Sequence, residues 1–131
     1  MARRKTNIAE IDRGWLVYAD MFDSQGKDYA GPHYAIVLTK KEEIDVDDRM
    51  DVVPISHNAS IADPLDMVPV DPSYGLNKNC YAICSWMIPG LLHRNAIIRA
   101  HKPGVDCDAF LLEVMRKAAP FRRLGSRSPD S

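Results

Sequence analysis

The sequence has no long apolar run and no excess of charge of one sign. Apolar stretches such as 35–38 and 81–84 are far shorter than the roughly 18 residues that a membrane-spanning helix needs. Its 17 basic and 18 acidic side chains give a formal net charge of −1. That balance excludes a chain whose affinity for nucleic acid comes from bulk positive charge. We therefore expect no membrane segment, and any site for phosphate should be a local one.

Cysteine is scarce as well. The chain contains Cys80, Cys84 and Cys107. An odd number without a disulfide-framework spacing favours the reducing cytoplasm over a secreted, disulfide-built domain. The basic N-terminus, residues 1–7, has no apolar segment behind it and so does not resemble a secretory signal. We expect a cytoplasmic protein.

A zinc site is one interpretation of Cys80 and Cys84 taken together with His93 and His101. The two cysteines lack paired Cys-x-x-Cys spacing and lie in an apolar stretch. Buried thiols are therefore the favoured interpretation, and we expect no metal and no cofactor.

With 131 residues, of which 46% are hydrophobic and 27% charged, the chain is long enough for one domain and too short for two. A domain of this size buries roughly 65–70% of the surface that its unfolded chain exposes, so its core needs no disulfide. We expect a single domain over residues 1–120. Residues 121–131, with their Arg, Ser, Gly and Pro, should form a flexible basic tail.

Short apolar stretches rich in Val, Ile and Tyr alternate with turn residues along most of the chain. They predict about six strands, at 15–19, 33–39, 50–56, 65–70, 80–87 and 95–99. Pro89-Gly90 is one of the turn markers. Pro54 and Pro69 lack the N–H that a sheet ladder uses, so their strands should lie at an edge, or be bent or bulged. The pattern predicts a mostly β fold, a small and strongly bent barrel or sandwich.

The last apolar pattern has helical spacing. Its apolar positions are Val105, Phe110, Leu111, Val114, Met115 and Ala118. Asp106 or Asp108 is available as the N-cap, and Pro120 should close the segment. One C-terminal amphipathic helix packed on the barrel is expected.

An acidic segment separates the second and third expected strands. It contains Glu42, Glu43, Asp45, Asp47, Asp48 and Asp51. A metal-binding loop is one interpretation, but the spacing matches no calcium-loop pattern, so a solvated, mobile connection is favoured. Such a segment repels nucleic acid, and a phosphate site should therefore lie on another face.

The first third of the chain resembles a known family. Residues 14–20 are Gly-Trp-Leu-Val-Tyr-Ala-Asp, residues 26–34 are Gly-Lys-Asp-Tyr-Ala-Gly-Pro-His-Tyr, and residues 35–39 are Ala-Ile-Val-Leu-Thr. Together with 51–56, which end in Ser after an apolar run, they resemble the MazF/PemK family of toxin endoribonucleases. The resemblance covers about residues 13–118, is strong over 13–39 and is weak from 72 to 102.

The resemblance implies an SH3-like barrel of the CcdB/MazF/PemK type, with about six strands and a C-terminal helix. It also implies a homodimer that cleaves single-stranded RNA without a metal ion, by attack of the ribose 2′-hydroxyl. A cognate antitoxin would hold the enzyme inactive. The catalytic residues of the family fall on Asp28, His33 and Ser56. Where the family has Arg-Pro this chain has His33-Tyr34, and where it has Asp-Gln this chain has Ser85-Trp86.

This cleavage needs a base for the 2′-hydroxyl, an acid for the leaving 5′-oxygen and donors for the phosphoryl oxygens. Histidine can act as acid or base near neutral pH, whereas arginine is a poor proton donor. His33 is therefore expected to transfer a proton and Ser56 to donate a hydrogen bond to a phosphoryl oxygen. Asp28 would orient His33 or act as the base. Lys27 or Arg94 would supply positive charge.

Aromatic residues can stack on splayed RNA bases, and Tyr29, Tyr34 and Trp86 are the candidates. Trp86 is equally a candidate for the barrel core. Two other functions fit the same barrel. A catalytically inactive form would bind a protein or nucleic acid, and the Arg-to-His and Gln-to-Trp changes would then record lost catalysis. A gyrase-poisoning toxin of the related fold would arrest growth and leave RNA whole.

Overall fold

The structure is a computed structural model that describes residues 8–20, 32–58, 60–76, 79–104 and 107–125. The elements are β1 (Leu16–Ala19), β2 (His33–Val37), α1 (Lys41–Asp47), β3 (Arg49–Ser56), β4 (Met67–Pro69), β5 (Tyr81–Ile83), β6 (Ile88–His93), β7 (Ile97–His101) and α2 (Asp108–Gly125). No helix in the described ranges is both long and apolar enough to cross a membrane.

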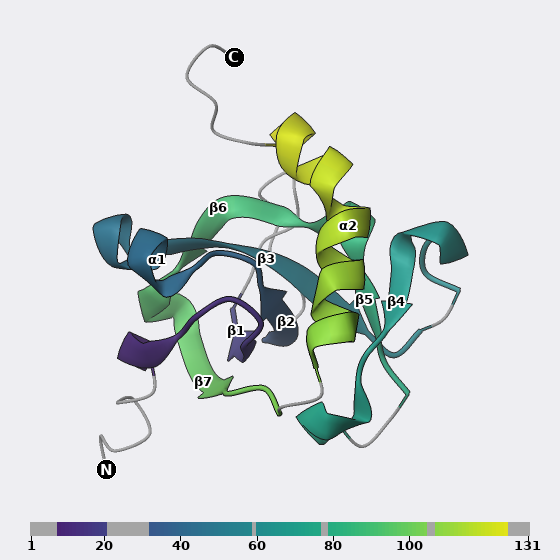
Figure 1. Cartoon of the computed structure of the whole chain (residues 1–131), viewed down its shortest axis with the longest axis horizontal. Helices are drawn as coiled ribbons and strands as arrows, with labels where there is room; N and C mark the ends of the chain where they lie inside the picture. Colours follow the sequence, from purple (N-terminus) through teal and green to yellow (C-terminus); the bar gives the residue numbers. More distant parts are fainter. Residues whose placement is uncertain (1–7, 21–31, 59, 77–78, 105–106, 126–131) are drawn as a thin grey trace.

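The strands form one antiparallel sheet with β3 near its middle. The order is β4-β5-β3-β2-β1-β7, and β6 pairs with β3 outside this path. Figure 1 shows α2 lying across the molecule beside β4 and β5, whereas α1 lies at the far side, near the start of β3. The expected mostly β fold with a C-terminal helix is confirmed, and the described residues contain seven strands where about six were expected.

The additional strand lies in the stretch that was expected to form one strand at 80–87 followed by a turn at Pro89-Gly90. The strand expected at 80–87 is only β5, because residues Cys84–Trp86 form a 3-10 turn. The strand β6 then begins at Ile88 and includes Pro89-Gly90, which was expected to be a turn. That expectation was wrong.

Pro89-Gly90 can lie within β6 because the β3–β6 ladder is irregular at this point. Between the pairs Met50–Leu92 and Val52–Ile88, β3 advances by two residues and β6 by four. The additional residues of β6 form a bulge, which is one of the few places in a sheet that tolerate proline and favour glycine.

The two strand prolines behave differently. Pro69 lies in β4, an outer strand, as expected. Pro54 lies in the central β3, so the edge position, one of the alternatives expected for it beside a bend or a bulge, does not apply. The N–H of Leu38 donates to the carbonyl of Asp51 at 2.9 Å. Backbone groups alternate along a strand, so the nitrogen of Pro54 faces away from β2. It lies where β3 changes its partner from β6 to β5, and neither ladder needs its N–H.

Alternate residues of the central strands contribute to two separate apolar cores. The α1-side core contains Val17, Val37 and Val52, together with Ile11 and with Ile44 of α1, all fully buried. Because side chains alternate along a strand, the neighbouring residues point to the other face of the sheet.

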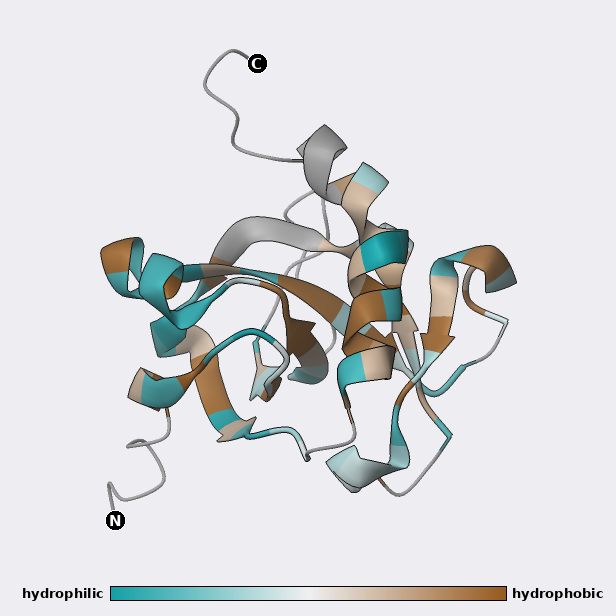
Figure 2. Cartoon of the chain, in the orientation of Figure 1, coloured by the Kyte–Doolittle hydropathy of each residue, from teal (hydrophilic) through white to brown (hydrophobic). Residues whose placement is uncertain are grey.

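The α2-side core is formed by that other face. It contains Leu16, Ile36 and Val53 from the strands and Phe110 and Val114 from α2. Figure 2 shows strongly hydrophobic residues along β3 and on the part of α2 that lies over the sheet. The expected packing of an amphipathic helix on the sheet is confirmed.

The ends of α2 differ from expectation. Asp108 is its first residue rather than a cap, and Asp106 lies outside the described residues. The helix continues through Pro120, so the expectation that this proline closes it was wrong. Phe121 packs on the α2-side core, which favours continuation of the helix beyond the proline. Of the expected tail, 121–125 are therefore helical, and 126–131 lie outside the described residues.

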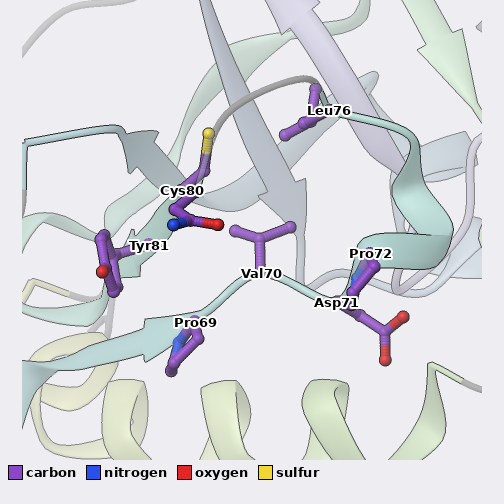
Figure 3. Close-up of a pocket in the computed structure, with 8 residues that line it drawn as sticks. Pro69, Val70, Asp71, Pro72, Leu76, Cys80 and Tyr81 are labelled. Atoms are coloured by element: carbon purple, nitrogen blue, oxygen red, sulfur yellow. The ribbon is translucent and has the colours of Figure 1, made fainter.

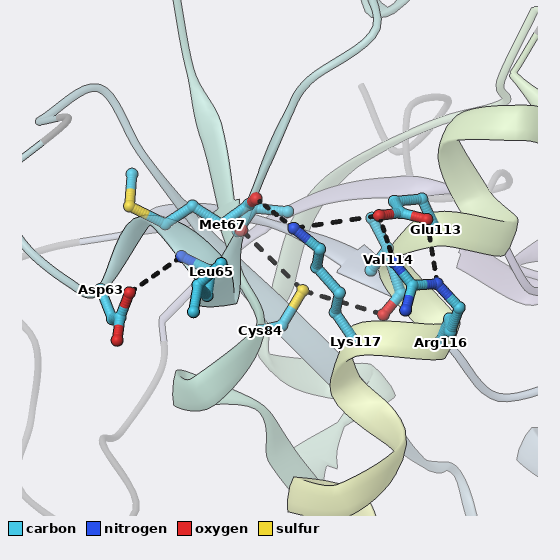
Figure 4. A network of polar contacts seen from close by, with 9 residues as sticks. Asp63, Leu65, Met67, Cys84, Glu113, Val114, Arg116 and Lys117 are labelled. Carbon is cyan, nitrogen blue, oxygen red and sulfur yellow. Dashed lines mark hydrogen bonds and ion pairs between the residues drawn. The ribbon is translucent and has the colours of Figure 1, made fainter.

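Polar contacts also attach α2 to the sheet, as Figure 4 shows. The Nζ of Lys117 donates to the carbonyl of Met67 at 3.2 Å and lies 3.8 Å from the carboxylate of Glu113. The thiol of Cys84 is 3.7 Å from the carbonyl of Val114. Burial raises the pKa of Cys84 to about 11. Cys84 is thus a buried thiol, as expected, whereas Cys80, for which burial was also expected, is only half-buried.

Candidate active site

A cavity at one end of β2 and β3 contains three of the residues singled out from the sequence. Its volume is about 450 Å³, and it is lined by His33, Pro54, Ile55, Ser56, His57, Ile61 and Trp86. Its lining is mainly apolar, with two imidazoles, one hydroxyl and one indole. Among the described residues that line it, none carries a fixed charge.

The strand register brings His33 and Ser56 together. β2 and β3 pair without a register shift, and their last described pair is Ala35 with Pro54. Two residues further on, the same register places His33 opposite Ser56. Residues two apart point to the same face, and directly opposite Cβ atoms are roughly 4.5–5.5 Å apart. One imidazole and one hydroxyl therefore line the same cavity.

The chain turns sharply after Ser56. The N–H of Asn58 donates to Oγ of Ser56 at 3.1 Å, and the N–H of Ser60 donates to the side-chain oxygen of Asn58 at 2.9 Å. These contacts fold the segment back, so that His57 and Ile61 also line the cavity. A hydroxyl oxygen that accepts one hydrogen bond still carries its own proton. Ser56 can therefore donate to a ligand in the cavity.

Trp86 reaches the cavity because the 3-10 turn Cys84–Trp86 interrupts the strand that was expected there. The N–H of Met87 closes this turn on the carbonyl of Cys84 at 3.3 Å. Trp86 is half-buried and belongs to neither of the two cores. The sequence left open whether Trp86 fills the barrel core. The structure places it in the wall of the cavity instead.

Tyr34 does not line this cavity. It follows His33 in β2, so its side chain points to the other face of the sheet, toward the α2-side core. Its ring centroid lies 4.8 Å from that of Tyr18, and the guanidinium of Arg99 lies 4.3 Å from the Tyr18 ring centroid. The predicted stacking on RNA would have to take place on that second face.

Arg94 lies at the opposite end of β3 from Ser56. Its neighbour His93 pairs with Arg49, the first residue of the eight-residue strand, and such a strand spans about 23 Å. The guanidinium of Arg94 is 2.7 Å from a carboxylate oxygen of Asp45 and 3.2 Å from one of Asp48. The structure thus pairs this cation with two carboxylates and does not bring it to the cavity.

The same contacts correct the interpretation of the acidic segment. Residues 41–47 form the short helix α1 rather than a mobile connection, and Asp48 ends it in a left-handed conformation with φ at 63°. Asp45 accepts hydrogen bonds from Lys41 at 2.9 Å and from Arg94 at 2.7 Å. The acidic residues therefore hold α1 against the turn after β6.

We expect Asp45→Asn to lower the melting temperature at neutral pH, but not in strong acid. The hydrogen bond from Arg94, followed by that from Lys41, lowers the pKa of Asp45 from its usual 3.8. A carboxyl group with a lowered pKa stabilises the fold above its unfolded-state pKa and loses this contribution as the pH falls through the folded-state value. The effect should be small, because solvent screens exposed ion pairs. Thermal unfolding at pH 7 and at about pH 2 measures it; a difference that persists unchanged in acid would contradict the assignment.

Three predicted residues of the site, Lys27, Asp28 and Tyr29, lie outside the described residues. Their roles stay predictions. Four lining residues were not selected from the sequence, namely Pro54 and Ile55 of β3 and, beyond the strand, His57 and Ile61. The last two lie at the turn. The signal for them was Ser56 followed two residues later by Asn58, because both side chains favour turns that reverse the chain.

Within the described ranges, no three His, Cys, Asp or Glu side chains are grouped closely enough to hold a metal ion. His93 accepts a hydrogen bond through Nδ1 from the N–H of Asn95 at 3.0 Å. Cys84 contacts the carbonyls of Ala82 and Val114. The zinc interpretation finds no support in these contacts.

A second, smaller cavity lies beside β4 and β5, at the outer edge of the sheet. Its volume is about 220 Å³, and Figure 3 shows residues that line it, including Pro69, Val70, Cys80 and Tyr81. It contains none of the predicted site residues. The first cavity is therefore the candidate active site.

The sequence matches no protein-family model. It matches no curated protein either.

Solved structures share the fold. MazF from Deinococcus radiodurans is 21% identical over 85% of this chain and 94% of its own, with a TM-score of 0.65. A MazE-MazF complex from the same organism gives 20% identity over 88% of this chain and 97% of that chain, with a TM-score of 0.62. An endoribonuclease in complex with its cognate antitoxin, from a mycobacterial species, gives 13% identity, 91% and 97% coverage and a TM-score of 0.59. At this level of identity the likeness establishes a MazF-type fold.

Proposed function

We propose that this chain is a MazF-type toxin that cleaves single-stranded RNA in the cytoplasm without a metal ion. A cognate antitoxin would hold it inactive, and the active form would be a homodimer. One observation carries the proposal: His33 and Ser56 line a single cavity at the end of the β2–β3 ladder. Proteins of the same fold include an endoribonuclease in complex with its cognate antitoxin.

The chemistry of the cavity fits this reaction. The ribose 2′-hydroxyl is an internal nucleophile, so the protein needs to move protons and to stabilise charge on the phosphoryl oxygens. The imidazole of His33 can transfer a proton, and the hydroxyl of Ser56 can donate to a phosphoryl oxygen. The indole of Trp86 at the same cavity provides a surface on which a base can stack.

Incubation of the purified protein with a long RNA tests the proposal. We expect fragments that end in a 2′,3′-cyclic phosphate and begin with a 5′-hydroxyl, formed equally in the presence of a chelator. A His33→Ala preparation purified in parallel controls for contaminating nucleases. Intact RNA throughout pH 5–8 would refute the proposal, and growth arrest without RNA cleavage would favour a toxin with another target.

A further inference from the structure

A second imidazole lines the cavity that contains His33. His57 follows Ser56 directly, at the bend where the chain leaves β3. The hydrogen bond between Asn58 and Ser56 holds this bend, so His57 lines the cavity although the strand has ended. The described lining therefore contains two imidazoles, the side chain that most often serves as a general acid or base. His57 follows Ser56 in the chain, and the β2–β3 register places His33 opposite Ser56.

We propose that His33 and His57 form the acid–base pair of the reaction, an inference that rests on the proposed ribonuclease function. His57, in its neutral form, accepts the proton of the ribose 2′-hydroxyl. The 2′-oxygen forms a bond to phosphorus while the bond from phosphorus to the 5′-oxygen breaks. His33, in its protonated form, gives its proton to that 5′-oxygen. The products are a 2′,3′-cyclic phosphate and a 5′-hydroxyl, and proton exchange with water then restores both imidazoles.

Two groups are needed because one side chain cannot be neutral and protonated in the same step. General acid and general base catalysis each contribute about 10²–10⁴-fold. An arginine in place of His33 would supply charge but hardly a proton. With histidine at position 33 and at position 57, one cavity contains both a donor and an acceptor. Ser56 precedes His57 in the chain and lies opposite His33 in the β2–β3 register. Its hydroxyl is left to bind a phosphoryl oxygen.

The two roles follow from exposure. His33 is half-buried, and its backbone is paired within the sheet with Ala19 of β1. His57 is exposed at the bend, where a base can pass its acquired proton to solvent between turnovers. We therefore assign the base to His57 and the acid to His33.

A substrate with a better leaving group distinguishes the two roles. Once the cleavage site of the wild-type protein is mapped, that oligonucleotide is made with sulfur in place of the 5′-bridging oxygen. A thiolate leaves without needing a proton. His57→Ala should lower the cleavage rate about 10²–10⁴-fold on both substrates. His33→Ala should cleave the natural RNA as slowly as His57→Ala does. On the sulfur-containing substrate its rate should be close to that of the wild type.

His101→Ala is the matched control, because His101 is an exposed histidine of β7 outside the cavity. It should leave both rates unchanged, and circular dichroism confirms that all variants fold. Natural RNA cut at the wild-type rate by His57→Ala would overturn the acid–base pair while leaving the ribonuclease function standing. If the sulfur-containing substrate restores the rate of His57→Ala and not that of His33→Ala, the assignment of roles is overturned. A wild-type protein that leaves RNA intact would instead refute the ribonuclease function, and the pair with it.

Discussion

His33→Ala is expected to lower the single-turnover rate of RNA cleavage by about 10²–10⁴-fold, the usual contribution of a general acid. The reason lies in the lining of the cavity, where no described residue carries a fixed charge. Without the imidazole, the Ser56 hydroxyl remains as a phosphate ligand, but the leaving oxygen has no donor opposite it. The rate on the mapped RNA measures the effect, and loss of growth arrest on expression is the cellular readout. A rate within a factor of about three of the wild-type rate would contradict the role of His33, because a general acid contributes far more than that.

His33→Arg separates charge from proton transfer. Arginine provides a fork of donors and a permanent positive charge, but its pKa is too high for it to give up a proton during the reaction. We expect a rate above that of His33→Ala and below that of the wild type. Equal rates for the Arg variant and the wild type would show that position 33 supplies charge alone.

The sequence identified His33 and Ser56 separately, at the start of one strand and at the end of another, but it could not show whether they approach each other. Both strands are apolar and continuous enough to be recognised, and a register slip of one residue would exchange their two buried faces. Both faces of β2 are buried, as Ile36 and Val37 show at 0% exposure, so the apolar pattern alone does not distinguish one register from the next. The register that places His33 opposite Ser56 is set by the packing of side chains from distant segments.

The elements that were missed depend on contacts between segments far apart in the chain. Pro89-Gly90 marks a turn in most sequences, and only the pairing of β6 with β3 makes it a bulge. The acidic segment has the composition of a solvated loop, but Arg94 pairs with Asp45, 49 residues earlier in the chain, and holds the segment as α1. Local composition contains no information about such a partner.

The candidate site was incomplete for a related reason. His57 and Ile61, which were not selected, line the cavity because the chain folds back in a short turn after Ser56. A turn of three residues changes where a side chain points without changing the apolar pattern around it. The sequence therefore identified the residues that lie in regular strands more readily than those at the turns.

Phe110→Ala is expected to lower the free energy of unfolding by about 3–5 kcal/mol, the usual cost of removing a buried phenyl ring. Phe110 is 7% exposed in the α2-side core, and its ring meets that of Tyr74 edge-on at 5.7 Å between centroids. Truncation leaves a cavity between α2 and the sheet, and the aromatic contact is lost as well. Urea unfolding at a fixed protein concentration measures the change.

Leu112→Ala is the matched control for Phe110→Ala, because it lies two residues further along the same helix and is 68% exposed. It should change the free energy of unfolding by no more than about 0.5 kcal/mol. A loss for Phe110→Ala no larger than that of the control would mean that α2 does not hold the sheet together. A loss of several kcal/mol for Leu112→Ala would mean that another molecule covers this face of α2, as one surface of the proposed homodimer or antitoxin complex.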